Sequence, residues 1–208
     1  MYYYNQCVQI PNSIQLNKDG QYCIVCFSGP VERIYQNGLT YYKCRSCGST
    51  AERSLVIDSR INWWIDERNN YWHESAGVVI INQEGKILSL LRKIFPFSYT
   101  IPAGHVDKNE DSKETAVREL MEETGIDTNT EKLELLLEFD DSEDPCRRGS
   151  DHHKWHVYRL RIHGTNTVSQ DDETSSAEWC DINELRERNN LTEPFDRILK
   201  TLGESLIN

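Results

Sequence analysis

Residues 104–126 read GHVDKNEDSKETAVRELMEETGI, and this stretch decides the fold. Asp111 followed three residues later by Glu114 forms the pattern of a capping box, in which two side chains satisfy the free backbone groups at a helix start. Gly125 is typical of the position just after a helix, where a left-handed backbone conformation is needed. The sequence therefore predicts a helix that begins near Asp111 and ends at Gly125.

Three carboxylates lie on one face of this predicted helix. At about 100° per residue, Glu119, Glu122 and Glu123 fall within roughly one third of its circumference. Like charges at such spacings destabilise an isolated helix, and no lysines are interleaved to offset them. Carboxylate oxygens are the ligands that Mg²⁺ and Mn²⁺ prefer. The face is thus a candidate divalent-metal site, where a metal ion could bridge diphosphate oxygens and acidify a water molecule.

The complete spacing resembles that of a Nudix box. Gly104 is followed after five residues by Glu110, and after seven more by the run Arg118–Ile126. The resemblance extends over about residues 72–205. It implies an α/β/α sandwich and metal-dependent hydrolysis of a nucleoside diphosphate linked to another moiety, with small nucleotide-derived substrates and Mg²⁺ or Mn²⁺ as catalytic cofactor.

The resemblance also implies roles for individual residues. Arg118 and Glu110 form an ion pair that fixes the loop over the helix, while Gly104 and Gly125 supply the turns into and out of the box. Ala103 stands where a second glycine is frequent in the family. The metal ligands implied are the side chains of Glu119, Glu122 and Glu123 and the carbonyl oxygen of Ala103.

A further carboxylate is expected from outside the box, because water that attacks phosphorus needs a base or an additional metal ligand. In several Nudix enzymes, such a glutamate precedes a strand that contains a tryptophan. Glu173, six residues before Trp179, is our prediction for this role, with Asp171 and Asp172 as alternatives in the same loop. A flexible acidic loop without a role is the simpler interpretation. Glu143 and Asp144 are the next candidates.

The first 50 residues contain two cysteine pairs that predict a structural zinc ribbon. The pairs are Cys23-x2-Cys26 and Cys44-x2-Cys47, a spacing that suits a tetrahedral Zn²⁺ site. Between them, Asn37-Gly38 separates two apolar runs and predicts a β-hairpin. Gly29 and Gly48 follow the pairs closely, as sharp turns would require. A disulfide framework is disfavoured, since the cysteine total of seven is odd and no export signal is visible.

Residues 51–71 are predicted to form a connecting helix. Ser49 and Glu52 resemble a capping box, and Ile57, Ile61 and Ile65 recur at helical spacing. A packing helix between domains is the simpler interpretation, and the interface of a homodimer is the alternative. The predicted organisation is therefore a zinc ribbon over 1–50, a connecting helix over 51–71 and a Nudix domain over 72–208.

Hydrophobic patterning supplies the remaining elements of the predicted α/β fold. The runs 76–81 and 86–91 flank a short polar turn and should pair as a hairpin. Further strands are predicted at 133–139 and 155–162 and before Trp179, and helices near 182–188 and 195–202. The aromatic candidates for stacking on a base are Tyr99, Trp155 and Trp179, although aromatic residues in such sheets are more often core.

A zinc ribbon before a Nudix domain is similar to the layout of NADH pyrophosphatases. That subfamily carries a Ser-Gln-Pro-Trp-like array after the box, whereas this chain has DSEDPCRRG at residues 141–149. The connecting helix is a second departure. An NADH or ADP-ribose pyrophosphatase, and a non-catalytic module that binds a nucleotide or a partner, are therefore the alternatives to a general Nudix hydrolase.

Charge and hydropathy exclude several functions. The net charge is −11, and residues 71–208 carry 28 acidic against 16 basic side chains. Such an excess repels phosphate polymers, so nucleic-acid binding driven by backbone charge is not expected. Arg147-Arg148 is the one short basic track that could serve RNA 5′ ends. No apolar run is long enough to span a membrane, and we expect a cytoplasmic protein.

The remaining histidines and cysteines carry weaker signals. His152, His153 and His156 enter a predicted strand close to Cys146. Adjacent strand residues point to opposite faces, so His152 and His153 are not expected to share a metal ion. We interpret the run as a polar strand entrance rather than a second metal site. Ordinary buried or surface thiols are predicted for Cys7, Cys146 and Cys180.

Overall fold

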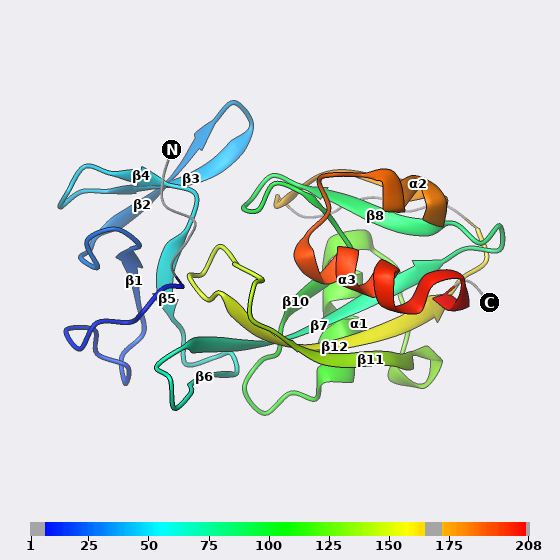
Figure 1. Cartoon of the computed structure of the whole chain (residues 1–208), viewed down its shortest axis with the longest axis horizontal. Helices are drawn as coiled ribbons and strands as arrows, with labels where there is room; N and C mark the ends of the chain where they lie inside the picture. Colours follow the sequence, from blue (N-terminus) through cyan, green and yellow to red (C-terminus); the bar gives the residue numbers. More distant parts are fainter. Residues whose placement is uncertain (1–6, 165–171, 207–208) are drawn as a thin grey trace.

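The computed structural model describes residues 7–164 and 172–206, and its chain forms a small N-terminal subdomain beside a larger α/β sandwich (Figure 1). The subdomain contains a two-stranded and a three-stranded sheet. No helix among the described residues is long and apolar enough to cross a membrane. The strands of the subdomain are β1 (Gly20–Cys23), β2 (Val31–Gln36), β3 (Leu39–Cys44), β4 (Thr50–Ala51) and β5 (Ser54–Ile57).

The predicted zinc-ribbon hairpin is confirmed. Strands β2 and β3 pair in antiparallel register from Val31↔Cys44 to Gln36↔Leu39. The two residues between them, Asn37 and Gly38, have positive φ values of 52° and 78°. A two-residue turn with both φ values positive matches the twist of the flanking strands, which is why Asn-Gly favours this connection.

The predicted connecting helix over residues 51–71 is wrong. The segment forms strands instead, namely β5, then β6 (Trp63–Ile65), then the start of β7. β5 pairs with β1, and β6 pairs with β7. The isoleucine spacing is also compatible with short strands separated by polar turns, and the residues involved are mostly β-branched or aromatic, which favours strands. A homodimer interface on a connecting helix is therefore lost with the helix.

The sandwich is built on an eight-stranded sheet whose main path is β11-β12-β7-β8-β13. β12 runs parallel to β7, whereas the other neighbours are antiparallel. The strands of this sheet other than β6 are β7 (Tyr71–Ile81), β8 (Ile87–Arg92), β9 (Tyr99–Thr100), β10 (Ala103–His105), β11 (Glu134–Asp141), β12 (His152–Arg161) and β13 (Thr174–Cys180).

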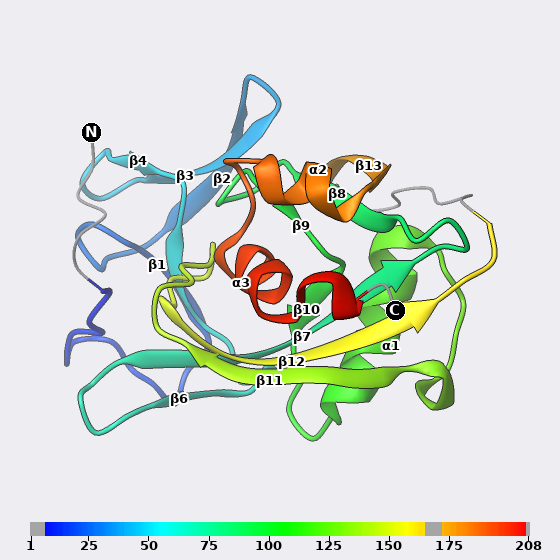
Figure 2. The same cartoon turned by 45° about the vertical axis from the view of Figure 1, so that its right-hand side comes forward.

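Helices cover both faces of this sheet (Figures 1 and 2). Ala76, Val78 and Ile80 of β7 belong to the core beneath α1, whereas Val79 and Ile81 belong to the core beneath α2 and α3. This alternation buries every residue of β7 from Ser75 onward, and the predicted α/β/α sandwich is confirmed. The helices are α1 (Ser112–Thr124), α2 (Ile182–Glu187) and α3 (Glu193–Leu202), with 3-10 turns at Thr130–Lys132 and Gly203–Leu206.

The strands predicted at 133–139 and 155–162 and the helices predicted near 182–188 and 195–202 are present within a few residues. The hairpin between 76–81 and 86–91 differs from its prediction in extent. β7 and β8 pair at Ile81↔Ile87, next to the turn, and then diverge. β7 continues beside β10 and β6, and β8 continues beside β9 and β13.

A third small core joins the subdomain to the sandwich. Leu55 and Ile57 of β5 pack with Tyr71, the first residue of β7, and all three are at most 1% exposed. The loop between β11 and β12, residues 142–151, completes the junction. The backbone N–H groups of Ser54 and Val56 donate to the carbonyl oxygens of Arg147 and Arg148, each over 3.0 Å.

Gly149 allows the closest approach in this junction. Its φ is +93°, and a Cβ placed there would lie 2.9 Å from both Leu55 Cα and Ser54 O. Those are backbone atoms, which cannot rotate away as a side chain can. Gly164 has a similar φ of +96° but nothing within 4 Å of the corresponding position, so it provides a matched control.

We predict that Gly149→Ala destabilises the protein more than Gly164→Ala. The control should lower the free energy of unfolding by about 1–2 kcal/mol, the cost of a left-handed conformation for a residue with Cβ. Gly149→Ala should lower the free energy of unfolding by this amount and by about 1–3 kcal/mol more, because the added Cβ overpacks the junction. Urea denaturation followed by tryptophan fluorescence measures both values. Equal losses would contradict close packing at Gly149.

Candidate functional site

Helix α1 has the ends predicted for it. Its N-cap is Asp111, whose side chain accepts from Lys113 N, and the Glu114 side chain accepts from Asp111 N to complete the capping box. Gly125 ends the helix with a φ of 72°. These two ends fix the register of the helix, so that Glu119, Glu122 and Glu123 occupy the last two turns.

Strand β10 lies against the carboxylate face of α1. The backbone N–H of Ala103 donates to Glu123 Oε2 over 2.9 Å. A Cβ placed on Gly104 would lie 2.0 Å from Glu119 Oε1, so Glu119 takes its position only because residue 104 has no side chain. The predicted role of Gly104 as a turn is wrong, because Gly104 pairs with Ala76 inside a strand. The role of Ala103 as a carbonyl ligand stays a prediction.

Arg118 forms the predicted ion pair with Glu110. Its Nε lies 3.2 Å from Glu110 Oε1 and its Nη2 lies 3.0 Å from Glu110 Oε2, a two-pronged contact. Nη2 also donates to the carbonyl oxygen of His105 over 3.3 Å, and Nη1 donates to Glu119. Arg118 therefore ties the loop before α1, strand β10 and one of the predicted metal ligands together.

The three glutamates on the carboxylate face of α1 differ in exposure. The Glu119 side chain is 15% exposed, and that of Glu122 is 58% exposed and lies 3.6 Å from Arg118. Burial raises the pKa of Glu119, and the neighbouring Arg118 opposes this rise. Among the described residues, these carboxylates do not form a group with all ligand atoms within 4.8 Å of one another. Instead, Glu119 and Glu122 contact Arg118, and Glu123 accepts from the backbone N–H of Ala103.

The donor set nevertheless fits a hard divalent cation. Glu119, Glu122 and Glu123 offer six carboxylate oxygens on one helix face, and Mg²⁺ and Mn²⁺ bind such oxygens in preference to nitrogen or sulfur. A cation there would offset the burial that raises the pKa of Glu119. These three residues are the ones that would hold a catalytic metal.

A cavity of about 430 Å³ opens in front of the glutamates. Its lining includes acidic side chains, namely Asp107, Glu119, Glu122 and Glu123, and the basic side chains of Arg92, Arg147 and Arg148. Phe95 and Pro96 add apolar surface. Its size suits a small nucleotide-derived ligand. Carboxylates and guanidinium groups in one cavity can together hold a metal-bound anion.

Glu173 lines this same cavity. Its Oε1 lies 2.7 Å from Arg147 Nη2, and both side chains are about one-quarter exposed. The alternative Asp171 lies outside the described residues. Asp144 also lines the cavity, but its Oδ2 accepts from Trp155 Nε1 over 2.8 Å. The structure thus brings Glu173 to the box residues, while its role in the reaction stays a prediction.

The aromatic candidates separate into different environments. Trp155 lines the cavity but is 7% exposed and held by Asp144. The Tyr99 ring lies under the guanidinium group of Arg188, 4.1 Å from ring centroid to Cζ. Trp179 packs against the core beneath α1. Sequence patterns gave no signal for Arg92, the last residue of β8, or for Phe95 in the loop that follows, because no motif surrounds either residue.

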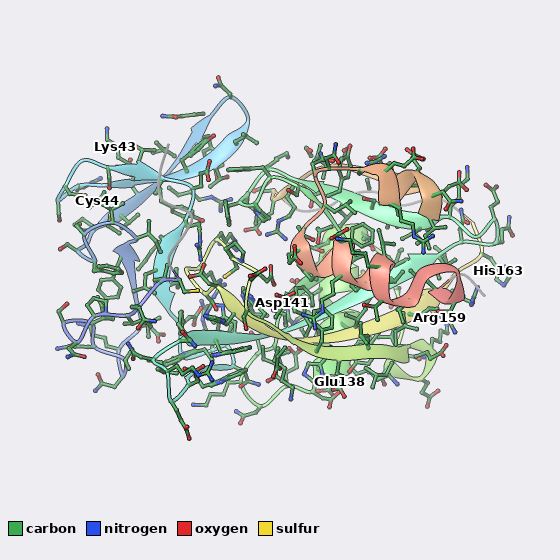
Figure 3. All side chains as sticks on the ribbon, viewed as in Figure 1. Lys43, Cys44, Glu138, Asp141, Arg159 and His163 are labelled. Atoms are coloured by element: carbon green, nitrogen blue, oxygen red, sulfur yellow. The ribbon has the colours of Figure 1, made fainter. Side chains whose placement is uncertain are left out.

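The four cysteines of the subdomain converge as predicted. All four Sγ atoms lie within 4.8 Å of one another, with Cys23–Cys47 at 3.8 Å and Cys26–Cys44 at 3.7 Å. Figure 3 shows Cys44 in the small sheet, away from the strands that carry Glu138 and Arg159. Tetrahedral zinc requires this convergence of thiolates.

Backbone N–H groups support the thiolates of both pairs. Val25 N lies 3.3 Å from Cys23 Sγ, and Ser46 N lies 3.3 Å from Cys44 Sγ. Hydrogen bonds from the Ser49 hydroxyl and backbone lower the pKa of Cys47. In the first knuckle, the positive φ of 55° belongs to Phe27 and not to Gly29, which corrects the turn predicted there.

Comparison with known proteins agrees with the geometry. Residues 72–202 match the NUDIX domain, which is more than half of the chain. The chain belongs to the Nudix family. The matched region begins at the second residue of β7 and ends at the last residue of α3, so the helical and strand layers of the sandwich are those of the family.

Curated relatives of this Nudix chain cover part of its length. The "ADP-ribose pyrophosphatase" of Methanocaldococcus jannaschii is 36% identical over 118 residues, which are 55% of this chain and 66% of that protein. The "RNA pyrophosphohydrolase" of Cereibacter sphaeroides is 36% identical over 78 residues, 37% of this chain and 47% of that protein. The chain thus spans less than two thirds of either relative.

A solved structure supports the Nudix fold. The NUDIX domain of Shewanella oneidensis NrtR, complexed with ADP ribose, superposes with a TM-score of 0.56 and 17% sequence identity. The superposition covers 68% of this chain and 93% of that one. At this identity the similarity concerns the fold.

We predict that Gly104→Ala weakens Mn²⁺ binding while the fold is retained. The added Cβ would displace the Glu119 carboxylate, and a misplaced ligand should weaken binding by about tenfold or more. Electron paramagnetic resonance of free Mn²⁺ during titration gives the affinity. Gly85→Ala, which has open space around its position in a distant turn, is the control. Unchanged affinity in Gly104→Ala would show that Glu119 is not a ligand.

Proposed function

We propose that this Nudix chain is a metal-dependent pyrophosphohydrolase that cleaves a small nucleoside diphosphate linked to another moiety. One observation carries the proposal. The carboxylate face of α1 and the guanidinium groups of Arg92, Arg147 and Arg148 line one cavity of about 430 Å³. A pyrophosphate with bound divalent cations fits in such a cavity, because the cations meet the carboxylates and the phosphate oxygens meet the arginines.

ADP-ribose is the substrate we propose to test first. The M. jannaschii relative named for that activity shares 36% identity over 118 residues. Phe95 also lines the cavity, but its side chain is 6% exposed and the Arg53 guanidinium group lies over its ring, 5.4 Å from the centroid, so the sequence similarity carries this choice. An NADH pyrophosphatase has weaker support, since the array typical of that subfamily is replaced by residues 141–149.

RNA 5′ ends are a less favoured substrate, although one relative is named an RNA pyrophosphohydrolase. A basic track would have to attract the RNA chain. Arg148 Nη1 lies 2.9 Å from Asp58 Oδ2, and Arg147 pairs with Glu173. Both arginines thus line the cavity beside carboxylates, a position that suits the diphosphate of a small bound ligand better than the extended backbone of an RNA chain.

The roles of the residues follow from their positions. Mg²⁺ or Mn²⁺, when bound, supplies Lewis acidity toward the phosphate oxygens and acidifies water. Glu119, Glu122 and Glu123 hold the cation, and Arg118 orients Glu119 and the loop that contains Glu110. Arg92, Arg147 and Arg148, which line the same cavity, bind the substrate phosphates. Glu173 accepts a proton from water or adds a metal ligand.

We predict that Glu122→Gln and Glu123→Gln each lower kcat by about 10²–10⁴-fold, because each removes a charged oxygen from the metal site. Turnover of ADP-ribose with saturating Mg²⁺ measures the loss, and circular dichroism checks the fold. Glu131→Gln, a surface change in a distant 3-10 turn, is the control. Near-normal turnover in both site variants would show that these carboxylates do not hold the catalytic metal.

Glu173→Gln should lower kcat more than it raises KM, because the interaction matters chiefly in the transition state. The ion pair with Arg147 provides the control. If Glu173 serves only to hold Arg147, then Arg147→Met and Glu173→Gln should have equal effects, and the double variant should be no worse than either. If Glu173 takes part in the reaction itself, the double variant should have a lower kcat than Arg147→Met alone. Glu173→Gln should then also change the pH–rate profile. An unchanged kcat would direct the search to Glu143.

The substrate is identified with a panel. NADH, ADP-ribose, dinucleoside polyphosphates, nucleotide sugars, nucleoside triphosphates and 5′-triphosphate RNA are each incubated with Mg²⁺ and with Mn²⁺, and products are separated by chromatography. The proposal expects AMP and ribose 5-phosphate from ADP-ribose. Cleavage restricted to RNA would overturn the substrate class, and binding without turnover of any compound would overturn the enzymatic function.

A further inference from the structure

A second cluster of metal-ligating side chains borders the catalytic cavity, since three of its members, His105, Cys146 and His153, line that cavity. His73, His105, Cys146 and His153 each place one ligand atom within 4.8 Å of all the others. His73 is 0% exposed and His153 is 2% exposed. The four residues come from β7, β10, the 142–151 loop and β12. Because no two are close in sequence in a metal-binding spacing, the cluster is a product of the fold.

The distances suit a tetrahedral ion after small side-chain movements. His73 Nδ1 lies 3.0 Å from His105 Nε2 and 3.6 Å from Cys146 Sγ. Zinc bonds of about 2.0–2.3 Å separate tetrahedral ligand atoms by about 3.3–3.8 Å. The His73 ring lies edge to face against those of His105 and His153, with centroids 4.6 Å and 5.5 Å away. The rings thus approach one point from different directions.

An outer carboxylate orients one of the rings. Asp144 Oδ2 lies 3.1 Å from His153 Nδ1 and accepts from Trp155 Nε1 over 2.8 Å. Histidines that bind metals commonly give their other ring nitrogen to such a carboxylate, which fixes the tautomer. The contact is an ion pair, since His153 Nδ1 makes no hydrogen bond among the described residues.

The protonation states fit metal binding at three of the four residues. Burial lowers the pKa of His73 and lowers that of His105 to about 3, so both imidazoles are neutral, as metal ligands must be. Burial opposes ionisation of Cys146, but the nearby His73 and His153 lower its pKa well below the usual value. A buried thiolate with two neutral imidazoles is a donor set for a borderline-soft cation such as zinc. At His153, burial lowers the pKa, but the nearby Asp144 and Cys146 raise it to about 10, so a bound zinc ion would have to displace the proton of that ring.

We propose that His73, His105, Cys146 and His153 bind a second zinc ion, separate from the zinc of the four-cysteine cluster. This ion would connect three strands of the sheet, β7, β10 and β12, to the 142–151 loop. His105 follows Gly104, and Cys146 precedes Arg147. The second zinc would therefore hold the acidic and the basic parts of the cavity lining in place. A metal-free hydrogen-bonded cluster is the alternative.

The first test is the metal content of the full chain purified without chelators. Mass spectrometry of metals should find two zinc ions per chain, and X-ray absorption at the zinc edge should find a shell of five sulfur and three nitrogen ligands shared by two ions. One zinc per chain with a purely sulfur shell would overturn the proposal. This measurement needs no variant, so it holds even where a substitution prevents folding.

Matched variants then locate the ion. His153→Gln and Cys146→Ser should each lose one equivalent of zinc, while Cys44→Ser should lose the other and keep the nitrogen ligands. His152→Gln is the control for His153→Gln, because the two residues are adjacent and buried but His152 stacks on Trp72. Cys7→Ser, at an exposed thiol, is the control for Cys146→Ser. Retention of two zinc ions by folded His153→Gln and Cys146→Ser would exclude these ligands.

Zinc content and catalysis are separate readouts. The metal count does not require a substrate, so it stands if no tested compound is hydrolysed. Conversely, a chain with one zinc that cleaves ADP-ribose would overturn the second zinc site and leave the proposed function intact.

Discussion

The backbone of β7 has hydrogen-bonding partners along both edges, and this requirement organises the molecule. A buried strand must pair its N–H and C=O groups, since water cannot reach them. One edge takes the parallel strand β12 from Trp72 to Ile81. The other takes β6, β10 and β8 in turn. The pairing with β10 places Ala103 and Gly104 against the carboxylate face of α1, and these two residues thereby position the carboxylates.

The local parts of this arrangement could be predicted from sequence. The ends of α1 depend on Asp111, Glu114 and Gly125, which lie within one short stretch, and the ribbon hairpin depends on Asn37-Gly38. Residues 51–71 could not be predicted in the same way. Ile57, Ile61 and Ile65 fit a helical period, yet β5 finds partners in β1 and in the 142–151 loop. Pairing with such distant residues overrides a local period.

In the candidate site, too, the residues that lie close together in the sequence could be predicted, and those that distant strand pairing brings together could not. The box residues Glu110, Arg118 and Glu119 were predicted together, and they meet because one helix and the loop before it carry them. Alternation along β12 separates His152 from His153, and of the two only His153 belongs to the cluster with Cys146, which the interpretation of the run as a polar strand entrance did not include. His73 and His105, the neighbours of His153 in the cluster, lie far from it in the sequence. Only the pairing of β7 with β10 and β12 brings them together.

The junction between β5 and the 142–151 loop has a consequence for synthesis of the chain. Residues 20–51 contain every cysteine ligand of the ribbon, so the ribbon can close as soon as it leaves the ribosome. β5 follows immediately, but the carbonyl groups of Arg147 and Arg148 that pair with it emerge about 90 residues later, some 5–20 s at typical rates of translation. During that interval one edge of β5 has backbone N–H groups without their later partners, beside a ribbon that has already folded. The nascent chain thus contains a folded module with an unpaired strand edge.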